Sequence, residues 1–347
     1  MRILITGNMG YVGPVVAKRL RETHRDAEIY GFDTAYFGDL LTGVYFPDRF
    51  LDRQIFGDLR EIRRKELEGI DAVVHLASLS NDPMGNKYEA QTMDINVRAG
   101  ERFAALAREE GVRSFVFASS CSVYGTAEDA APKNESSATN PLTAYARSKV
   151  EMEKILASLS APGFLTTSLR FATACGASPR LRLDLVLNDF VANAVASKKI
   201  RILSDGTPWR PLINVEDMAR AIDWAIRRDA GAGGTNLVVN AGRDDWNFQI
   251  ADLAHAVARV LGDVEVEINK HSEPDKRSYR VDFSLFAKLA GSFAPQCTLE
   301  KTIDDLRSVL GNFDYGGTDF RNSRYMRLRA LDYHKERGNL TPDLFWV

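Results

Sequence analysis

Short apolar runs alternate with amphipathic segments through the first half of the chain. The apolar runs predict β-strands near 2–6, 28–32, 54–56, 71–76, 114–118 and 165–170. Segments with apolar residues at helical spacing predict helices near 11–23, 60–67, 88–110 and 143–159. Because strands that alternate with helices are joined by crossover connections, this order indicates an α/β fold with a parallel, doubly wound sheet of the Rossmann type.

The pattern is less regular after residue 170. It predicts helices near 182–197, 216–229, 248–261 and 299–310, and strands near 236–240 and 264–268. We expect residues 1–175 to form the Rossmann domain, with strands from about 205–245 returning to it. Residues 176–347 then supply mainly a smaller lobe and a C-terminal tail that packs on the body. The long aromatic-rich connection at 34–53 is typical of either a functional loop or a self-packed surface loop.

The N-terminal segment carries the pattern of a dinucleotide-binding turn. Gly7, Gly10 and Gly13 follow the first strand in TGNMGYVG, and Asp33 ends the second strand twenty residues after Gly13. These glycines permit a tight turn, close approach of backbone N–H groups to a pyrophosphate, and close packing of the next helix, whose N-terminus favours anions. Asp33 would accept hydrogen bonds from the adenosine ribose and repel a 2′-phosphate. Since no Arg or Lys follows it until Arg49, NAD is favoured over NADP.

Composition and charge exclude several classes of protein. The chain has 347 residues, of which 45% are hydrophobic and 27% charged, as in ordinary globular proteins. The net charge of −2 gives no basic surface for nucleic acid, and no apolar run approaches the length of a membrane span. Met1 leads directly into the first strand, which leaves no room for a signal peptide. Cys121, Cys175 and Cys297 lie far apart without metal-ligand spacing, so we expect a cytoplasmic protein with no metal site.

A second motif supplies candidate chemistry. Tyr145 and Lys149 are four residues apart in YARSK, so their side chains share one face of a helix. They follow a serine-rich strand end, FVFASSCSVYG, at 115–125. A tyrosine that acts as a base near pH 7 needs roughly 4 kcal/mol of stabilisation of its phenolate. The ammonium group of Lys149 and a positively charged nicotinamide both have the sign that this requires.

With these motifs the chain resembles the extended short-chain dehydrogenase/reductase family, and within it the nucleotide-sugar epimerases and dehydratases. The resemblance spans nearly the whole sequence and includes Asp58-Leu59, HLAS at 75–78, DINVRAG at 94–100, LRFATACG at 169–176 and GTPWRPLINVEDMA at 206–219. It implies that Ser120, Tyr145 and Lys149 are catalytic. Ser120 would bond the reacting sugar oxygen, Tyr145 would move its proton, and Lys149 would also bind the nicotinamide ribose.

The glycine motif and the resemblance together imply two sets of binding residues. The set for NAD is Gly7, Asn8, Met9, Gly10, Tyr11, Val12, Gly13, Asp33, Asp58, Leu59, Leu76, Ala77, Ser78, Asn96, Ser119, Tyr145, Lys149, Phe171 and Thr173. The set for a nucleotide-diphosphate sugar, in a substrate-binding C-terminal lobe, is Ser120, Cys121, Ser122, Thr173, Arg180, Arg182, Asn188, Arg210, Arg277 and Arg280. Arg210 matches the family position that pairs with the diphosphate, which suits the forked guanidinium. For Arg277 and Arg280 a surface charge is the alternative.

The segment Ser120-Cys121-Ser122 separates the subclasses that the resemblance leaves open. Dehydratases and decarboxylases of the family need an acid within this segment, so its absence here disfavours elimination. NAD-dependent epimerisation through a transient keto sugar remains, with C4 the favoured carbon, and NADH-dependent reduction of a 4-keto sugar nucleotide is the alternative. Cys121 is either an inert buried residue or a thiol acid/base.

Two further expectations concern activity and assembly. A non-catalytic NAD sensor on this fold is disfavoured because Ser120, Tyr145 and Lys149 are intact. Family dimers pair through the segments that correspond to 88–110 and 143–159, so the resemblance implies a homodimer. The apolar contacts expected in it are Met93, Val97, Ala104 and Met152.

Overall fold

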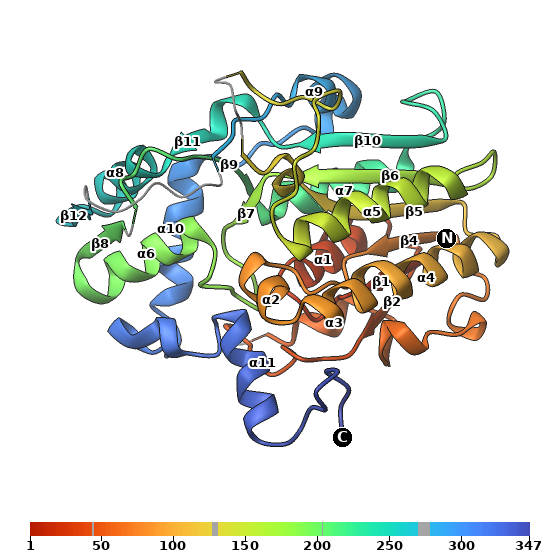
Figure 1. The fold of residues 1–347 in the computed structure, drawn as a ribbon, viewed down its shortest axis with the longest axis horizontal. Coiled ribbons are helices and arrows are strands. Elements are labelled where there is room, and N and C mark those ends of the chain that lie inside the picture. The colour runs from red at the N-terminus through yellow and green to blue at the C-terminus, as the bar shows by residue number, and fades with distance from the viewer. Residues whose placement is uncertain (44, 127–130, 203, 270–277) are drawn as a thin grey trace.

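A parallel seven-stranded sheet forms the centre of the computed structural model, which describes residues 1–43, 45–126, 131–202, 204–269 and 278–347. The strand order is β10-β6-β5-β4-β1-β2-β3 (Figure 1). The strands are β1 (Arg2–Thr6), β2 (Glu28–Asp33), β3 (Arg53–Phe56), β4 (Ala72–His75), β5 (Ser114–Ser120), β6 (Leu165–Phe171) and β10 (Asn236–Ala241). The order reverses between β1 and β4, and open α/β sheets bind ligands at such a reversal. The predicted fold class is confirmed.

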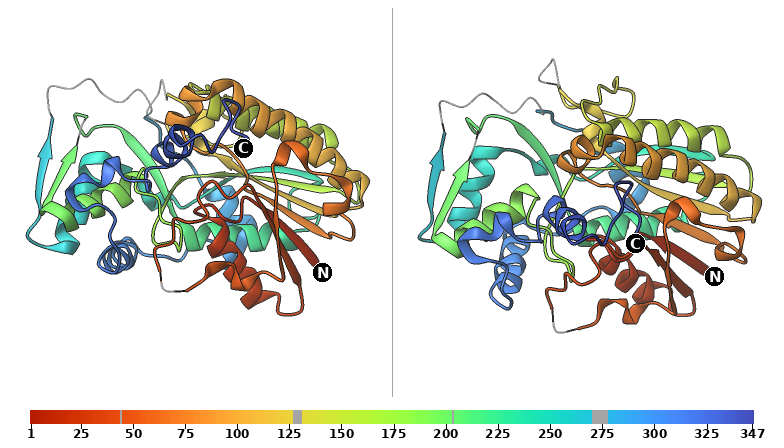
Figure 2. Two further views of the ribbon diagram at one scale, coloured as in Figure 1. Left: turned by 90° about the horizontal axis from the view of Figure 1, so that it is seen from below. Right: turned by 60° about the horizontal axis from the view of Figure 1, so that its bottom comes forward.

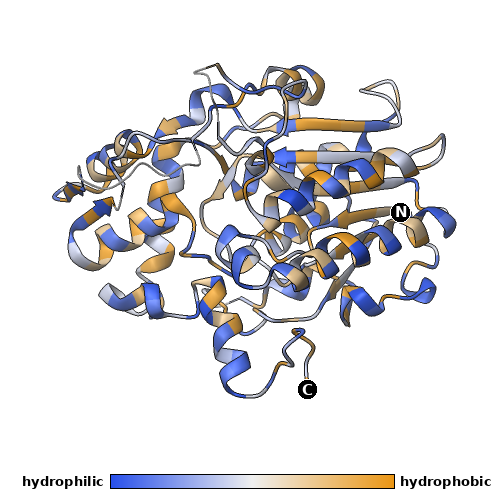
Figure 3. Cartoon of the chain, in the orientation of Figure 1, coloured by the Kyte–Doolittle hydropathy of each residue, from blue (hydrophilic) through white to orange (hydrophobic). Residues whose placement is uncertain are grey.

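Alternate strand residues face two different helical layers. Ile3 and Ile5 pack with α1 (Gly13–Thr23) and α7 (Val215–Arg227), whereas Leu4 packs with α4 (Gly100–Glu109) and α5 (Ala144–Leu159). Successive side chains of a strand point to opposite faces, so a strand covered on both sides is apolar throughout. Figure 3 shows this as largely apolar strands between helices of mixed hydropathy.

Two of the predicted helices differ from the structure. The predicted helix at 60–67 is wrong: two short 3-10 turns, Leu59–Glu61 and Arg64–Glu66, replace it. Each turn has its own cap, since Asp58 accepts from the backbone N–H of Arg60 and Glu66 accepts from that of Arg63. The predicted helix at 88–110 consists of α3 (Glu89–Met93), a π-helical turn at 94–99, and α4.

A smaller lobe lies beside the carboxyl edge of the sheet (Figure 1). Its helices are α6 (Val186–Ser197), α8 (Ile250–Leu261) and α10 (Leu299–Leu310), and its strands β8 (Lys199–Ile202) and β12 (Glu265–Ile268) pair with each other. A three-stranded sheet of β7 (Thr173–Cys175), β9 (Trp209–Asn214) and β11 (Asn247–Gln249) completes the described strands. The sequence pattern gave no separate prediction for β7, β8, β9, β11 or the helix α9 (Ser284–Ala290). Strands from about 205–245 were expected to return to the main sheet; β10 does so, whereas β9 belongs to the three-stranded sheet.

The C-terminal segment, made of α11 (Arg327–Glu336) and the residues after it, packs on the N-terminal half of the chain (Figure 2). Leu331, Leu340 and Leu344 are buried in one cluster with Tyr36, Leu79, Met84, Tyr88 and Ile95. The C-terminal segment thereby joins the loop after β2 to α2 (Asp82–Lys87) and its neighbours. The prediction that the tail packs on the body is confirmed.

Two of the residues expected at a dimer interface are placed elsewhere. Ala104 and Met152 are fully buried in the core between α4, α5 and the sheet, so they are not available to a second copy of the chain. Their small and flexible side chains fill space between the two helices instead. Met93 and Val97 are half-buried. The homodimer itself stays a prediction.

Candidate active site

A cavity of about 760 Å³ opens at the carboxyl edge of the main sheet. Its lining includes most of the residues predicted to bind NAD, namely Gly7, Gly10, Tyr11, Val12, Asp33, Asp58, Leu59, Leu76, Ala77, Ser78, Ser119, Tyr145, Lys149, Phe171 and Thr173. It also includes the predicted substrate residues Ser120, Ser122, Thr173, Arg182 and Arg210. The structure therefore brings most of the predicted NAD set and half of the predicted substrate set to one cavity.

The glycine turn has no room for side chains at two of its positions. Gly7 has φ +76°, and a Cβ built on it would lie 2.5 Å from the backbone nitrogen of Ala77. A Cβ on Gly13 would lie 2.3 Å from the carbonyl oxygen of Asn8. The turn thus brings the start of α1 to the end of β1 in the manner that pyrophosphate binding requires.

Asp33 is held at the end of β2 by the backbone. Its Oδ2 accepts from the N–H of Met9 at 2.8 Å, and its Oδ1 accepts from the N–H of Ala35 at 2.7 Å. Burial raises the pKa of its carboxyl group, and these two hydrogen bonds act in the opposite direction. Arg180 approaches this carboxylate from another segment, but its guanidinium is paired with Asp48 at 2.6 Å. The donor and acceptor set fits an adenosine ribose better than a 2′-phosphate.

Four residues of the predicted NAD set lie behind the lining and shape it. The N–H of Met9 orients Asp33, and Gly13 lets α1 approach the strand. The Nδ2 of Asn8 donates to Gln54 at 2.6 Å. Asn96 accepts from the backbone N–H of Leu79 at 2.9 Å and donates to the carbonyl of Leu79 at 3.1 Å, which fixes the loop after β4.

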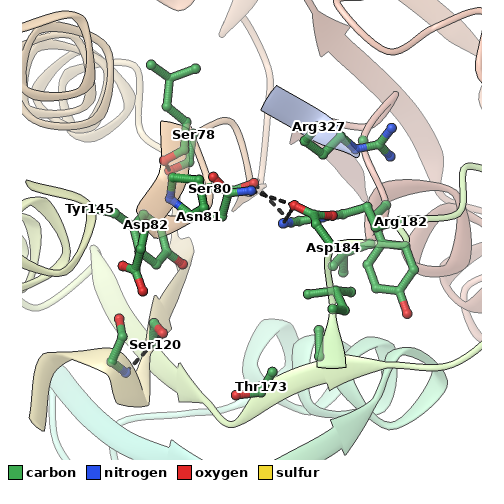
Figure 4. A pocket seen from close by; sticks show the side chains of 18 of the residues that line it. Ser78, Ser80, Asn81, Asp82, Ser120, Tyr145, Thr173, Arg182, Asp184 and Arg327 are labelled. Carbon is green, nitrogen blue, oxygen red and sulfur yellow. Dashed lines mark hydrogen bonds and ion pairs between the residues drawn. The ribbon is translucent and has the colours of Figure 1, made fainter. Parts of the chain in front are cut away.

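The three predicted catalytic residues come together although they lie on two elements. Ser120 ends β5, whereas Tyr145 and Lys149 lie one turn apart on α5, whose start is capped by Thr143. The side chain of Ser120 lies close enough to Tyr145 to lower the pKa of its phenol. The Nζ of Lys149 donates to the carbonyl of Ala118 at 2.8 Å and lies 5.3 Å from the ring centre of Tyr145. The phenol of Tyr145, the hydroxyl of Ser120 and the ammonium group of Lys149 thus line one cavity. Figure 4 shows the first two of these residues.

Burial controls the protonation of this pair. It raises the pKa of Tyr145 to about 12, while the hydroxyl of Ser120 and the charge of Arg182 lower this pKa and the charge of Asp82 raises it. Burial also lowers the pKa of Lys149 to about 7, against the carboxylate of Glu153, which raises it. A phenol in this environment needs positive charge nearby to lose its proton near neutral pH, and Lys149 and Arg182 are placed to supply it.

The structure adds residues to the cavity that the sequence did not predict, and three of them, Ser80, Asn81 and Asp184, link its opposite sides together with the predicted Arg182. Arg182 and Asp184 form an ion pair at 2.9 Å before α6 begins. Across the cavity, Arg182 donates to the Oγ of Ser80 at 3.2 Å, and the Nδ2 of Asn81 donates to Asp184 at 2.5 Å (Figure 4). The predicted helix at 182–197 starts only at residue 186, because 182–185 form this bridge.

Two further lining residues also come from outside the predicted sets. Asp82 accepts from the hydroxyl of Thr143 at 2.6 Å, next to Tyr145. Arg327 reaches the cavity from α11, donates to the carbonyl of Arg180 at 2.9 Å and stands 4.4 Å from the ring centre of Phe37. Burial lowers the pKa of Arg327 to about 9.

Three predicted substrate residues do not line the cavity, and each has a structural role instead. Cys121 is buried, its Sγ donates to the carbonyl of Arg170 at 3.1 Å, and burial raises the pKa of its thiol. Arg180 is fully buried against Asp48. Asn188 accepts from the N–H of Gly176 at 3.0 Å and so holds the loop after β7.

The last two predicted arginines are Arg277 and Arg280. Arg280 is not in the lining; its guanidinium stands 5.3 Å from the ring centre of Trp209. Arg277 lies outside the described residues.

In the part of the chain that the structure describes, no group of three or more His, Cys, Asp or Glu side chains is arranged to hold a metal ion. The same part contains no helix with the length and apolar character needed to cross a membrane.

Comparison with known proteins agrees with this geometry. Residues 3–242 match the model of the NAD dependent epimerase/dehydratase family. The chain belongs to this family. It is therefore an enzyme that uses NAD, and the resemblance read from its motifs is confirmed.

Individual members of the family show how far the similarity extends. The chain is 28% identical over 274 residues to a UDP-glucose 4-epimerase of Streptomyces lividans, which covers 75% of this chain and 81% of that protein. It is 30% identical over 250 residues to a UDP-glucose 4-epimerase of Lactobacillus helveticus, with 65% and 72% covered. Among solved structures, a UDP-N-acetylglucosamine 4-epimerase from Methanobrevibacter ruminantium M1 shares the fold, with a TM-score of 0.76, 24% identity, and 89% and 97% of the two chains covered.

Proposed function

We propose that this protein is an NAD-dependent nucleotide-sugar epimerase that inverts the sugar at C4 through a transient keto sugar. The observation that carries the proposal is the meeting of Ser120, Tyr145 and Lys149 in the cavity that the glycine turn also lines. The names of the similar family members support the reaction and the carbon. Arg210 lines the same cavity and is our candidate for the diphosphate of the substrate.

Each of the three residues has a separate part in the proposed chemistry. Bound NAD supplies a hydride acceptor and donor at its nicotinamide ring. Tyr145, as the phenolate, takes the proton of the sugar hydroxyl and returns it when the alkoxide forms again. Ser120 donates a hydrogen bond to the same oxygen, and Lys149 stabilises the phenolate and binds the nicotinamide ribose. No proton needs to leave a carbon atom, which agrees with the absence of an acid at 120–122.

The C-terminal segment favours epimerisation over net reduction. The part of the cavity that we assign to the adenosine is lined by Thr34, Tyr36, Asp58 and Leu59. The C-terminal segment contacts the chain at this end of the cavity. The indole N–H of Trp346 donates to the carbonyl of Thr34, and the guanidinium of Arg60 lies 3.4 Å from the ring centre of Phe345. Because these contacts hold Thr34 and the turn after Asp58 in place at the cavity wall, we expect bound NAD to exchange slowly. A reductase must exchange it in every turnover, whereas an epimerase regenerates it.

Several expectations from the sequence remain part of the proposal. We place NAD binding in residues 1–175 with β10, and substrate binding mainly in 176–347. We also propose a homodimer located in the cytoplasm. The intact Ser120, Tyr145 and Lys149 argue against a sensor that only binds NAD.

The proposal is tested by offering purified protein a panel of UDP-hexoses and UDP-N-acetylhexosamines without added cofactor. We expect interconversion of C4 epimers, followed by chromatography, with no net change in NADH absorbance at equilibrium. Consumption of added NADH in proportion to product would show a reductase, and loss of water from the sugar would show a dehydratase.

A further inference from the structure

A buried ion pair lies directly behind the candidate catalytic residues. Glu153 is on α5, four residues after Lys149, and is 6% exposed. Its carboxylate accepts from the Nη2 of Arg170 at 2.7 Å and from the Nε of Arg170 at 3.0 Å. The Oγ of Ser119 donates to the same carboxylate at 2.5 Å. Ser119 immediately precedes Ser120, so this carboxylate contacts the strand end that carries one catalytic residue and shares a helix with the other two.

The ion pair is completed by hydrogen bonds on its far side. The Nη1 of Arg170 donates to the hydroxyl of Tyr124 at 3.0 Å, and this hydroxyl donates to the Oδ1 of Asn240 at 2.7 Å. Replacing a buried ion pair by well-packed apolar residues is often neutral or stabilising. Stability alone therefore does not account for a Glu–Arg pair at this place.

We propose that Glu153 is a positioning residue for the catalytic centre, whose carboxylate supports the positive charge of Lys149 and holds the strand end that carries Ser120. The proposal rests on the roles given above to Tyr145 and Lys149. It adds a residue that touches neither the cavity nor the reacting atoms.

The surroundings of Lys149 explain why its charge needs support. The side chain is 4% exposed, and its Nζ lies 4.8 Å from the ring centre of Phe117. Among the described residues, the titratable groups that face it are Tyr145 and Glu153 on α5 and His75 on β4. Burial lowers the pKa of His75 to about 3, so this ring is neutral and contributes no charge of either sign. Glu153 is thus the anion that favours the ammonium form.

The effect of the Glu153 carboxylate on the protonation of Lys149 should be visible in the pH dependence of kcat. The limbs are assigned for the enzyme with NAD bound, in which the positive nicotinamide must bring the pKa of Tyr145 below that of Lys149. Activity then falls on the alkaline side as Lys149 loses its proton. Removing the negative charge of Glu153 disfavours the ammonium form, so Glu153→Gln should move the alkaline limb of kcat to lower pH by roughly one unit. Glu151→Gln is the matched control, because Glu151 lies on the same helix and pairs with Lys154 at a half-exposed position. It should leave the profile unchanged.

A second variant makes the test independent of how well Glu153→Gln folds. Arg170→Gln removes the cation that neutralises Glu153 and leaves its carboxylate in place. The alkaline limb should then move to higher pH, opposite to the shift in Glu153→Gln. If the ion pair is only structural, both variants lose activity while the alkaline limb of kcat stays at the same pH in each. This result, or shifts of the same sign in the two variants, would overturn the proposal.

Two measurements separate the effect of the Glu153 charge from the effect of its hydrogen bond to the strand. Ser119→Ala keeps the charge of Glu153 and removes its hydrogen bond to the strand, so kcat should fall severalfold while the alkaline limb stays at the same pH. The pH dependence of NAD affinity, followed by fluorescence titration, should shift in the same directions as the limb without relying on turnover. If Tyr145→Phe keeps normal turnover, the proposed function fails. If Tyr145→Phe is inactive but the Glu153 and Arg170 variants share the wild-type profile, only the present inference fails.

Discussion

Ser120 and Tyr145 line the same cavity, although one ends a strand and the other begins a helix. The hydroxyl of Ser120 lowers the pKa of Tyr145 against the effect of burial. Ser120→Ala should therefore move the acid limb of kcat to higher pH and reduce kcat by about 10²-fold, the lower end of the range for positioned acid–base groups. Ser120→Thr keeps the hydroxyl and is the control. An unchanged acid limb in Ser120→Ala would contradict this role.

The charges on the two sides of Tyr145 predict opposite shifts. Asp82 raises the pKa of the phenol and Arg182 lowers it. The phenolate is the active form, so activity is lost as the pH falls through this pKa. Asp82→Asn should move the acid limb to lower pH, and Arg182→Gln should move it to higher pH. Shifts of the same sign in both variants would show that the limb does not report Tyr145.

NAD should bind more tightly than NADP because the carboxylate of Asp33 would repel a 2′-phosphate. Asp33→Ala should narrow the difference between the two affinities, measured by fluorescence titration at constant ionic strength. Asp52, whose carboxylate pairs with Arg21 near the other end of β2, provides a control in Asp52→Ala. Equal affinity of the wild type for both cofactors would be incompatible with this assignment.

The C-terminal segment should slow the release of NAD. Deleting residues 340–347 removes Leu340 and Leu344 from a buried cluster, together with the contacts to Arg60 and Thr34. The variant should lose bound NAD during gel filtration, while the wild type and a variant lacking only the exposed Val347 retain it. Retention by all three proteins would show that other contacts hold the cofactor.

The sequence predicted the parts of the site that depend on neighbours in the chain. The glycine turn joins β1 to α1, Asp33 ends β2, and Tyr145 and Lys149 lie on one helix, so local spacing fixes the geometry of each. The main-sheet strands were also predicted, because strands buried on both faces read as continuous apolar runs.

The parts that were missed depend on contacts between distant segments. Arg180 was expected at the substrate, but its partner Asp48 lies 132 residues away, and no local pattern reveals that pairing. The same holds for the bridge from Arg182 to Ser80, which spans 102 residues. Arg327 reaches the cavity only because the C-terminal segment crosses the N-terminal half. The sequence Asn81-Asp82-Pro83 is a helix-start signal, and it would have marked the start of α2 and the end of the loop between β4 and α2 near the cavity.

The most direct test of the central claim compares turnover and NAD content in Tyr145→Phe. This variant deletes the hydroxyl that moves the proton and keeps the ring beside Lys149, so kcat for C4 epimer interconversion should fall by about 10²-fold to 10⁴-fold. The amount of bound NAD, measured after denaturation, should equal that of the wild type, whereas Lys149→Ala should lose both turnover and NAD. Near-normal turnover by Tyr145→Phe with an identified nucleotide sugar would contradict the account.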